Sequence, residues 1–97
     1  MDALPQHASV VVIGGGIMGC STLYHLAEMG VSDAVLVERN QLTSGTTWHS
    51  AAQVRALRSS SNLTRMIQYS VELYSRLEKE TGQQVGWIQE GSLSIAT

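Results

Sequence analysis

A run of glycines directly after a short β-branched segment constrains this chain most. Residues 10–13 read VVVI, and residues 14–19 read GGGIMG. A β-branched run that ends abruptly in glycines is typical of a strand buried on both faces of a parallel sheet. Residues 17–29 then carry apolar side chains near helical spacing and end at Gly30, which indicates a helix with a glycine stop.

A second apolar run follows that helix. Residues 34–37 read AVLV and are closed by Glu38. The order strand, helix, strand predicts an α/β fold that begins with a parallel βαβ unit and a right-handed crossover, as in a Rossmann-like domain. The expected parts are a βαβ unit at about 9–39, a polar loop at about 41–55, a helix at about 62–80 and a hairpin of an adjoining antiparallel sheet at about 84–97.

Two further side chains receive structural roles from the sequence. Asn62 can accept a hydrogen bond from the backbone at the start of the second helix, so it is the predicted N-cap. Trp48 is large and apolar, and a place in the core is favoured for it over a place beside a ligand.

The glycine segment fits the spacing G-x-G-x-x-G, and each glycine of that pattern meets a physical need. Gly14 permits a tight turn, Gly16 lets the backbone approach a pyrophosphate, and Gly19 lets the helix pack close to the strands. The first helical N–H groups, at Ile17 and Met18, attract negative charge. The segment therefore predicts a site for the diphosphate of a dinucleotide.

Glu38 lies at the end of the second strand, about twenty residues beyond the glycines. Its carboxylate can accept hydrogen bonds from the hydroxyls of an adenosine ribose, and its charge would repel a 2′-phosphate. FAD or NAD is thus favoured over NADP, although the neighbouring cation Arg39, a further candidate for cofactor binding, weakens that exclusion. The alternative interpretation is a glycine turn in an unrelated α/β unit.

The length and the charge of the chain further limit its domain organisation and its partners. A doubly wound nucleotide domain usually needs about 100–200 residues, so a chain of 97 residues is expected to be a fragment. The net charge is −2 and the cations are interleaved with acids, which argues against a nucleic-acid partner. The apolar run at 10–13 is far too short to cross a membrane.

Cys20 is the single cysteine of the chain. One thiol cannot make an internal disulfide or a multi-cysteine zinc site, so no metal site is expected and a reducing compartment is favoured. The cytoplasm is the predicted location, with the mitochondrial matrix as the alternative if a transit peptide is missing.

Residues 42–49, LTSGTTWH, resemble the segment that follows the second strand in sarcosine and dimethylglycine dehydrogenases, flavoenzymes of the D-amino acid oxidase-like superfamily. The resemblance runs from Val10 to the end of the chain. It includes YHLA at 24–27, EKETG at 78–82, GWIQ at 86–89 and GSL at 91–93. It implies the N-terminal piece of an FAD-dependent oxidoreductase, with FAD in place of NAD.

In this family the histidine of the TWH element is joined through an imidazole nitrogen to the 8α carbon of the isoalloxazine, and His49 stands at that position. A neutral imidazole is a competent nucleophile for that carbon. Family members often carry glycine where this chain has Ala52, and a Cβ there could clash if the position needs a positive φ.

The residues before Trp48 are further cofactor candidates. Hydroxyl and bare N–H groups suit a loop that closes over the diphosphate and ribityl chain, and this loop offers Ser44, Gly45, Thr46 and Thr47. The alternative for each is a local turn without a ligand.

The resemblance implies oxidation of an N-methylated amino acid such as sarcosine or dimethylglycine. A hydride would leave the N-methyl carbon for flavin N5, and the iminium would be hydrolysed to formaldehyde or captured by tetrahydrofolate bound elsewhere. Electrons would pass to an electron-transfer flavoprotein or to oxygen. Catalytic residues are expected beyond Thr97, so the fragment alone should be inactive. An NAD-dependent dehydrogenase and a non-catalytic nucleotide-binding module remain the alternatives.

Overall fold

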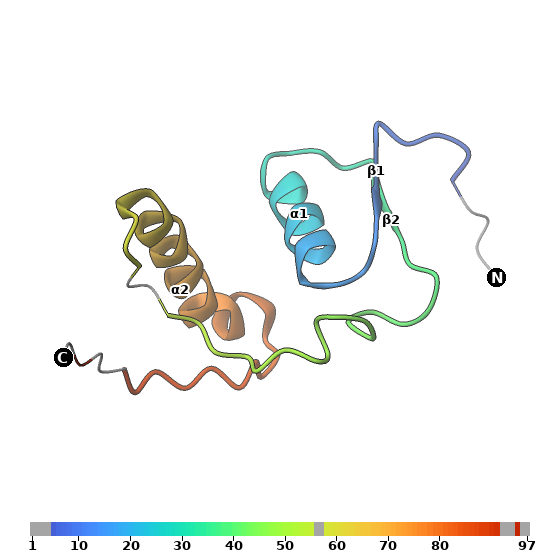
Figure 1. Ribbon diagram of the computed structural model, residues 1–97. Coiled ribbons are helices and arrows are strands. Elements are labelled where there is room, and N and C mark those ends of the chain that lie inside the picture. Colours follow the sequence, from blue (N-terminus) through green and yellow to red (C-terminus); the bar gives the residue numbers. More distant parts are fainter. Residues whose placement is uncertain (1–4, 56–57, 92–94, 96–97) are drawn as a thin grey trace. The chain divides into compact units, whose positions relative to one another are not determined.

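The computed structural model describes residues 5–55, 58–91 and 95. Its elements, labelled in Figure 1, are β1 (Val10–Ile13), α1 (Ile17–Glu28), β2 (Ala34–Val37) and α2 (Ser61–Thr81). The chain divides into two compact units, Met1–Ala51 and Ala52–Thr97, which we describe separately. In the described ranges neither helix has the length and apolar content needed to cross a bilayer.

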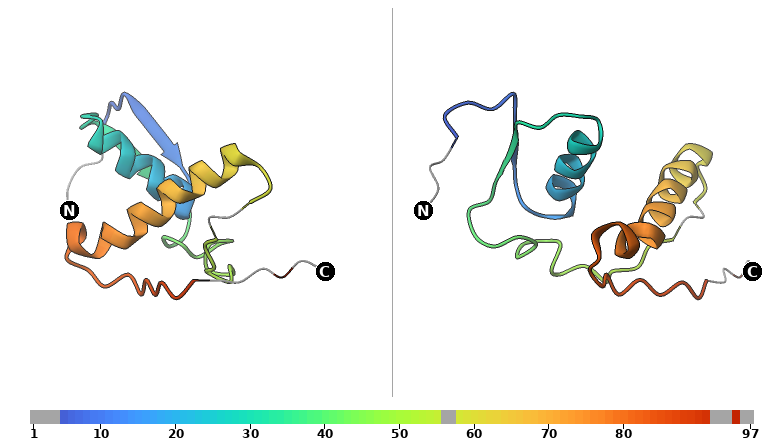
Figure 2. Two further views of the ribbon diagram at one scale, coloured as in Figure 1. Left: turned by 90° about the vertical axis from the view of Figure 1, so that its left-hand side faces the viewer. Right: turned by 180° about the vertical axis from the view of Figure 1, so that it is seen from behind.

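The first unit is a parallel βαβ unit. β1 and β2 pair in parallel, with Val10 opposite Ala34 and Ile13 opposite Val37. α1 connects the two strands and packs against both of them, as Figures 1 and 2 show from three sides. The predicted fold class is therefore confirmed: the chain begins as an α/β domain with a parallel strand pair.

Hydrogen bonds hold the strand pair at both ends. Before the strands, the Asp33 carboxylate accepts hydrogen bonds from the N–H of Ser9, at 3.2 Å, and from its hydroxyl. The hydroxyl bond is the main cause that lowers the pKa of Asp33 below its ordinary value. After the strands, the Gly14 N–H donates to the Val37 carbonyl at 2.9 Å. The glycine turn therefore starts level with the end of β2.

One face of the strand pair is open to solvent. Val11 and Ile13 point to that face and are 55% and 85% exposed, whereas Val10 and Val12 are half-buried. The expectation that β1 is buried on both faces is wrong for this chain. Alternate side chains of a strand face opposite ways, and within the first unit α1 covers one face of the strand pair.

The second unit is built on α2, and its N-cap differs from the prediction. Ser60 has extended backbone angles, and its hydroxyl accepts a hydrogen bond from the Leu63 N–H at 3.4 Å. Asn62 is already inside the helix, so its assignment as the N-cap is wrong. The helix ends at Gly82, whose φ of 72° is the left-handed conformation that glycine adopts easily. Leu73 of α2 is the buried apolar side chain of the described core.

The segment after α2 is extended and lies on the helix. The rings of Tyr74 and Trp87 stack with centroids 5.4 Å apart and planes at 21°. No strand is formed within residues 83–91. Most of the second arm of the predicted hairpin, residues 92–94 and 96–97, lies outside the described residues, so that hairpin stays a prediction.

Candidate functional site

Two glycines shape the turn between β1 and α1, which we call the fingerprint turn (residues 14–19). Gly14 has a φ of 112°, a conformation that other residues rarely adopt. A Cβ on Gly19 would lie only 1.8 Å from the carbonyl oxygen of Gly14. The start of α1 therefore approaches the end of β1 as closely as backbone atoms allow.

Glu38 is bound to the fingerprint turn. Its Oε1 accepts a hydrogen bond from the Gly15 N–H at 2.9 Å, and its Oε2 accepts one from the Asn40 N–H at 2.7 Å. The Asn40 bond first, then the Gly15 bond, lower the pKa of Glu38, and the positive charge of Arg39 adds to this effect. A carboxylate has about four acceptor positions, so both oxygens can still accept from ribose hydroxyls.

The second part of the site is the segment 42–50, which we call the TTWH loop. Successive hydrogen bonds from residue i+3 to residue i wind it into consecutive turns: Trp48 N–H to Gly45 O at 3.2 Å, His49 N–H to Thr46 O at 3.1 Å and Ser50 N–H to Thr47 O at 3.3 Å. The loop is therefore a compact body and not an extended strand.

Two hydrogen bonds attach the TTWH loop to the fingerprint turn. The Thr43 N–H donates to the Gly15 carbonyl at 2.9 Å. The Thr47 hydroxyl oxygen accepts from the Ile17 N–H, also at 2.9 Å. A Cβ on Gly16 would lie 2.8 Å from that hydroxyl oxygen, so the bare glycine makes room for it. The structure thus brings together two segments that the sequence assigned to one cofactor.

The imidazole of His49 is held in one orientation. Its Nδ1 lies 2.8 Å from the Gly45 carbonyl oxygen. Because a carbonyl can only accept, Nδ1 carries the proton, and Nε2 is the unprotonated nitrogen of the neutral ring. The Trp48 ring packs edge to face against the His49 ring, with centroids 5.1 Å apart.

Trp48 itself departs from the expectation. It is 73% exposed, so the prediction of a core position is wrong. The tight turns of the TTWH loop direct it outward, and the nearby His49 ring covers one of its edges only.

Other predicted cofactor residues lie less close to the fingerprint turn. The Ser44 hydroxyl donates to the Gln41 carbonyl at 2.8 Å, which is the local turn that the sequence left open as an alternative. Gly45 borders open space, and Met18 is exposed. The residues that the structure gathers at the turn are Gly14, Gly16, Ile17, Gly19, Glu38 and Thr47.

Sequence reasoning missed Gly15, which holds both Glu38 and Thr43. A Cβ there would lie 2.7 Å from a Leu42 methyl carbon and 3.0 Å from the Cγ of Glu38. The signal was available, because a third glycine stands at a position where the G-x-G-x-x-G pattern requires none. No such signal exists for Thr43 and Asn40, since they act through the backbone N–H that almost every residue has.

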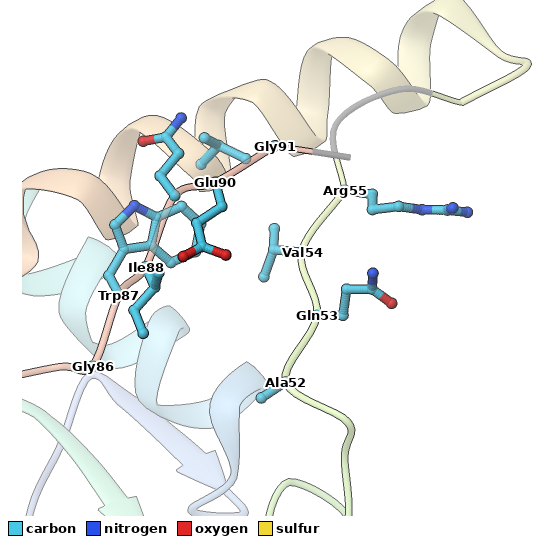
Figure 3. Close-up of a pocket in the computed structure, with 11 residues that line it drawn as sticks. Ala52, Gln53, Val54, Arg55, Gly86, Trp87, Ile88, Glu90 and Gly91 are labelled. Carbon is cyan, nitrogen blue, oxygen red and sulfur yellow. The ribbon is translucent and has the colours of Figure 1, made fainter. Parts of the chain in front are cut away.

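The hollow in the second unit is separate from these residues. It has a volume of about 600 Å³ and is lined by residues 52–55 and 86–91 together with Val71 of α2. Figure 3 shows Val54 on one side of it and Trp87 and Ile88 on the other. None of the predicted cofactor residues lines this hollow, so we do not assign it to the binding of a dinucleotide.

The fingerprint turn and the TTWH loop have the donors and acceptors that a dinucleotide needs. Gly16, the N-cap of α1, has no side chain to cap the helix. Thr47 accepts from the Ile17 N–H, and the next N–H groups of the first turn lack a partner within the helix and can donate to a diphosphate. Thr47 adds a hydroxyl and Glu38 a carboxylate. The arrangement fits the adenosine diphosphate half of FAD.

The relatives of this chain among known proteins include two dehydrogenases and one regulatory subunit. Sarcosine dehydrogenase, mitochondrial, from Mus musculus is 55% identical over 95 residues, which are 97% of this chain and 10% of that protein. Dimethylglycine dehydrogenase, mitochondrial, from Rattus norvegicus is 48% identical over 92 residues, 95% of this chain and 11% of that protein. The mitochondrial pyruvate dehydrogenase phosphatase regulatory subunit from Mus musculus is 48% identical over 94 residues, which are 97% of this chain and 11% of that protein.

The chain thus spans about a tenth of the length of these relatives. The resemblance to sarcosine and dimethylglycine dehydrogenases that the sequence indicated is confirmed. The family model described as FAD dependent oxidoreductase matches residues 9–97, a range that includes the fingerprint turn, Glu38 and the TTWH loop. The chain therefore belongs to the family of FAD dependent oxidoreductases.

Proposed function

We propose that this chain holds FAD in an enzyme that oxidises an N-methylated amino acid such as sarcosine or dimethylglycine. One observation carries the proposal: the hydrogen bond from the Ile17 N–H to the Thr47 hydroxyl unites the fingerprint turn with the TTWH loop. The diphosphate site and the candidate attachment residue, His49, then belong to one small unit. Two relatives named as dehydrogenases of sarcosine and dimethylglycine support the substrate class.

Each residue of the unit has a role toward FAD. The N–H groups at the start of α1, with Gly16 bare beside them, would bind the diphosphate. Glu38 would accept from the ribose hydroxyls, and Arg39 would keep that carboxylate ionised. FAD supplies the hydride acceptor, flavin N5, for oxidation of the N-methyl carbon. The rest of the TTWH loop, with Ser44, Gly45 and Thr46, would cover the diphosphate and ribityl chain.

His49 would form the covalent bond to the flavin. The Gly45 carbonyl holds the Nδ1 proton, so Nε2 has the lone pair that would attack the 8α carbon after that methyl group has lost a proton. The new bond would leave the flavin reduced by two electrons, which oxygen or the electron-transfer flavoprotein would then accept. The exposure of Trp48 beside it leaves this side of the loop open to a ring system. A covalent bond would retain the flavin through many turnovers.

Partners and location follow from the same proposal. An electron-transfer flavoprotein or oxygen would receive the electrons, and tetrahydrofolate would capture the one-carbon product at a site outside this chain. The two dehydrogenase relatives carry the word mitochondrial in their names, which favours the matrix over the cytoplasm.

The test is acid denaturation of the full-length protein, followed by gel electrophoresis and flavin fluorescence of the band. We expect acid-stable fluorescence in the wild type, and its loss in His49→Ala. His25→Ala is the matched control, because His25 also binds a backbone carbonyl through Nδ1, that of Ser21, at 2.7 Å. Its band should stay fluorescent. FAD released from the wild type would leave a non-covalent FAD enzyme, and protein without flavin would overturn the proposal.

A regulatory module is the second candidate function. The 48% identity to a phosphatase regulatory subunit favours it, because that relative matches the chain as well as dimethylglycine dehydrogenase does. The two candidates differ in the reduction of bound flavin. Sarcosine or dimethylglycine added without oxygen should bleach the flavin of an enzyme, whereas flavin that stays oxidised with every N-methyl amine would favour the regulatory role.

A further inference from the structure

We propose that Thr47 is the positioning residue for covalent flavin attachment, because its hydroxyl holds the first N–H of α1 and thereby fixes the turns that carry His49. This inference rests on the function proposed above and deepens it. The Thr47 hydroxyl would align both the diphosphate site and the imidazole nitrogen that attacks the flavin.

The Thr47 hydroxyl lies where a helix needs an acceptor. Ile17 is the first residue of α1, and the first N–H groups of a helix lack partners within it. Thr47 Oγ1 accepts from the Ile17 N–H at 2.9 Å. A hydroxyl that accepts through a lone pair keeps its own hydrogen, and within the described residues that hydrogen goes to no acceptor. Thr47 can therefore accept from α1 and donate to a phosphate oxygen at the same time.

The same residue is rigidly connected to His49. Thr47 and His49 belong to one run of turns, in which the Ser50 N–H donates to the Thr47 carbonyl and the His49 N–H to the Thr46 carbonyl. The imidazole is tied to the Gly45 carbonyl of that run. A shift of Thr47 relative to α1 would therefore move the imidazole with it.

The other attachment of the TTWH loop lies at its far end. The Thr43 N–H donates to Gly15 there, and Thr43 has a φ of 63°, so the chain changes direction at that point. Without the Thr47 hydroxyl, the loop would keep the Thr43 bond to the fingerprint turn and lose the bond that lies nearest to His49. The histidine end would then be held less firmly relative to α1. Reaction rates fall steeply when reacting atoms are displaced by about 1 Å.

Thr22 provides a matched comparison for Thr47. It has the same side chain, but it lies on α1, where its hydroxyl donates to the Met18 carbonyl at 2.8 Å within the helix. Thr47, in contrast, accepts from the first N–H of α1, and a Cβ on Gly16 would lie 2.8 Å from its hydroxyl oxygen. Loss of the Thr22 hydroxyl should therefore leave the position of His49 unchanged.

The experiment compares Thr47→Val, Thr47→Ser and Thr22→Val in the full-length protein, prepared without FAD and then mixed with excess FAD. Acid-stable fluorescence gives the rate of covalent attachment, and total flavin gives binding. We expect Thr47→Val to bind FAD and to attach it at least about tenfold more slowly than the wild type. Thr47→Ser, which keeps the hydroxyl, and Thr22→Val should stay within about twofold.

A second readout needs no FAD. Hydrogen exchange at the Ile17 amide should be slow in the wild type, Thr47→Ser and Thr22→Val, and fast in Thr47→Val, because only that variant lacks the acceptor. Unchanged exchange in Thr47→Val would overturn the inference, even if that variant failed to take up FAD. Attachment by Thr47→Val at the wild-type rate would overturn it too, and would leave the covalent bond at His49 standing. A wild type that binds FAD without a covalent bond would overturn this inference and the bond at His49, and would leave a non-covalent FAD enzyme. A wild type without any flavin would overturn the proposed function as well.

Discussion

The Glu38 carboxylate and the Gly15 N–H join the end of β2 to the middle of the fingerprint turn through a hydrogen bond of 2.9 Å. The same carboxylate accepts from the Asn40 N–H, so one acid connects the fingerprint turn with the chain just after β2. The proposed acceptor for a ribose and the proposed donors for a diphosphate are therefore aligned with each other by the protein alone. A site arranged in this way loses little conformational entropy when a dinucleotide binds.

The lowered pKa of Glu38 predicts a pH-dependent stability. A carboxyl whose pKa is lower in the folded state stabilises the fold fully above its ordinary pKa, about 4.3, and this contribution is lost as the pH falls through the folded value. The midpoint of thermal unfolding should thus fall more steeply below about pH 4.3 in the wild type than in Glu38→Gln. Glu28→Gln, at the exposed end of α1, is the control and should follow the wild type. Parallel curves for the wild type and Glu38→Gln would contradict the prediction.

Gly19→Ala should disrupt the start of α1. Its Cβ would lie 1.8 Å from the Gly14 carbonyl oxygen, and backbone must move to relieve that contact. We expect a loss of about 1–3 kcal/mol in stability and poor retention of FAD on gel filtration. Gly45→Ala is the control, since no atom lies within 4 Å of the added carbon. A Gly19→Ala protein that keeps its FAD as well as Gly45→Ala does would show that the turn is less tight than described.

Ala52→Gly should stabilise the protein. Ala52 has a φ of 56°, and the left-handed conformation costs a residue with a Cβ roughly 1–2 kcal/mol. The greater freedom of glycine in the unfolded chain offsets about 0.4–1 kcal/mol of this, so the net gain should be about 1 kcal/mol or less. Thermal unfolding would detect it. Ala51→Gly gives the comparison: its φ is not positive, so only the entropic loss should remain.

Ser60→Ala should weaken the first turn of α2 by about 1 kcal/mol, because it removes the acceptor for the Leu63 N–H. Asn62→Ala should have no such effect, since Asn62 lies inside the helix. Hydrogen exchange at the Leu63 amide distinguishes the two variants, with faster exchange expected in Ser60→Ala only. The reverse result would restore Asn62 as the N-cap.

The fingerprint turn could be predicted from the sequence because its determinants are local. The conformation of Gly14, the close approach at Gly19 and the place of Glu38 all follow from the order strand, glycines, helix, strand and acid. A chain with that order has few ways to bury its apolar runs, so the pattern and the geometry agree.

The N-cap of α2, the exposure of Trp48 and the backbone hydrogen bonds of the site could not be predicted, because the sequence does not distinguish between the alternatives. Residues 59–62 are three serines and an asparagine, each competent as an N-cap, and the packing of the helix decides for Ser60. The exposure of Trp48 follows from the path of the loop. Thr43 and Asn40 form their hydrogen bonds through backbone N–H groups, which do not depend on the residue type. Tertiary contacts decide each of these, and residue type does not.

The ties that assemble the cofactor site connect residues close together in the chain. The Glu38 and Thr47 bonds to the fingerprint turn span 23 and 30 positions. Loop closure over such short separations costs little entropy and is fast. The site can therefore form on a nascent polypeptide soon after Ser50 has left the ribosome.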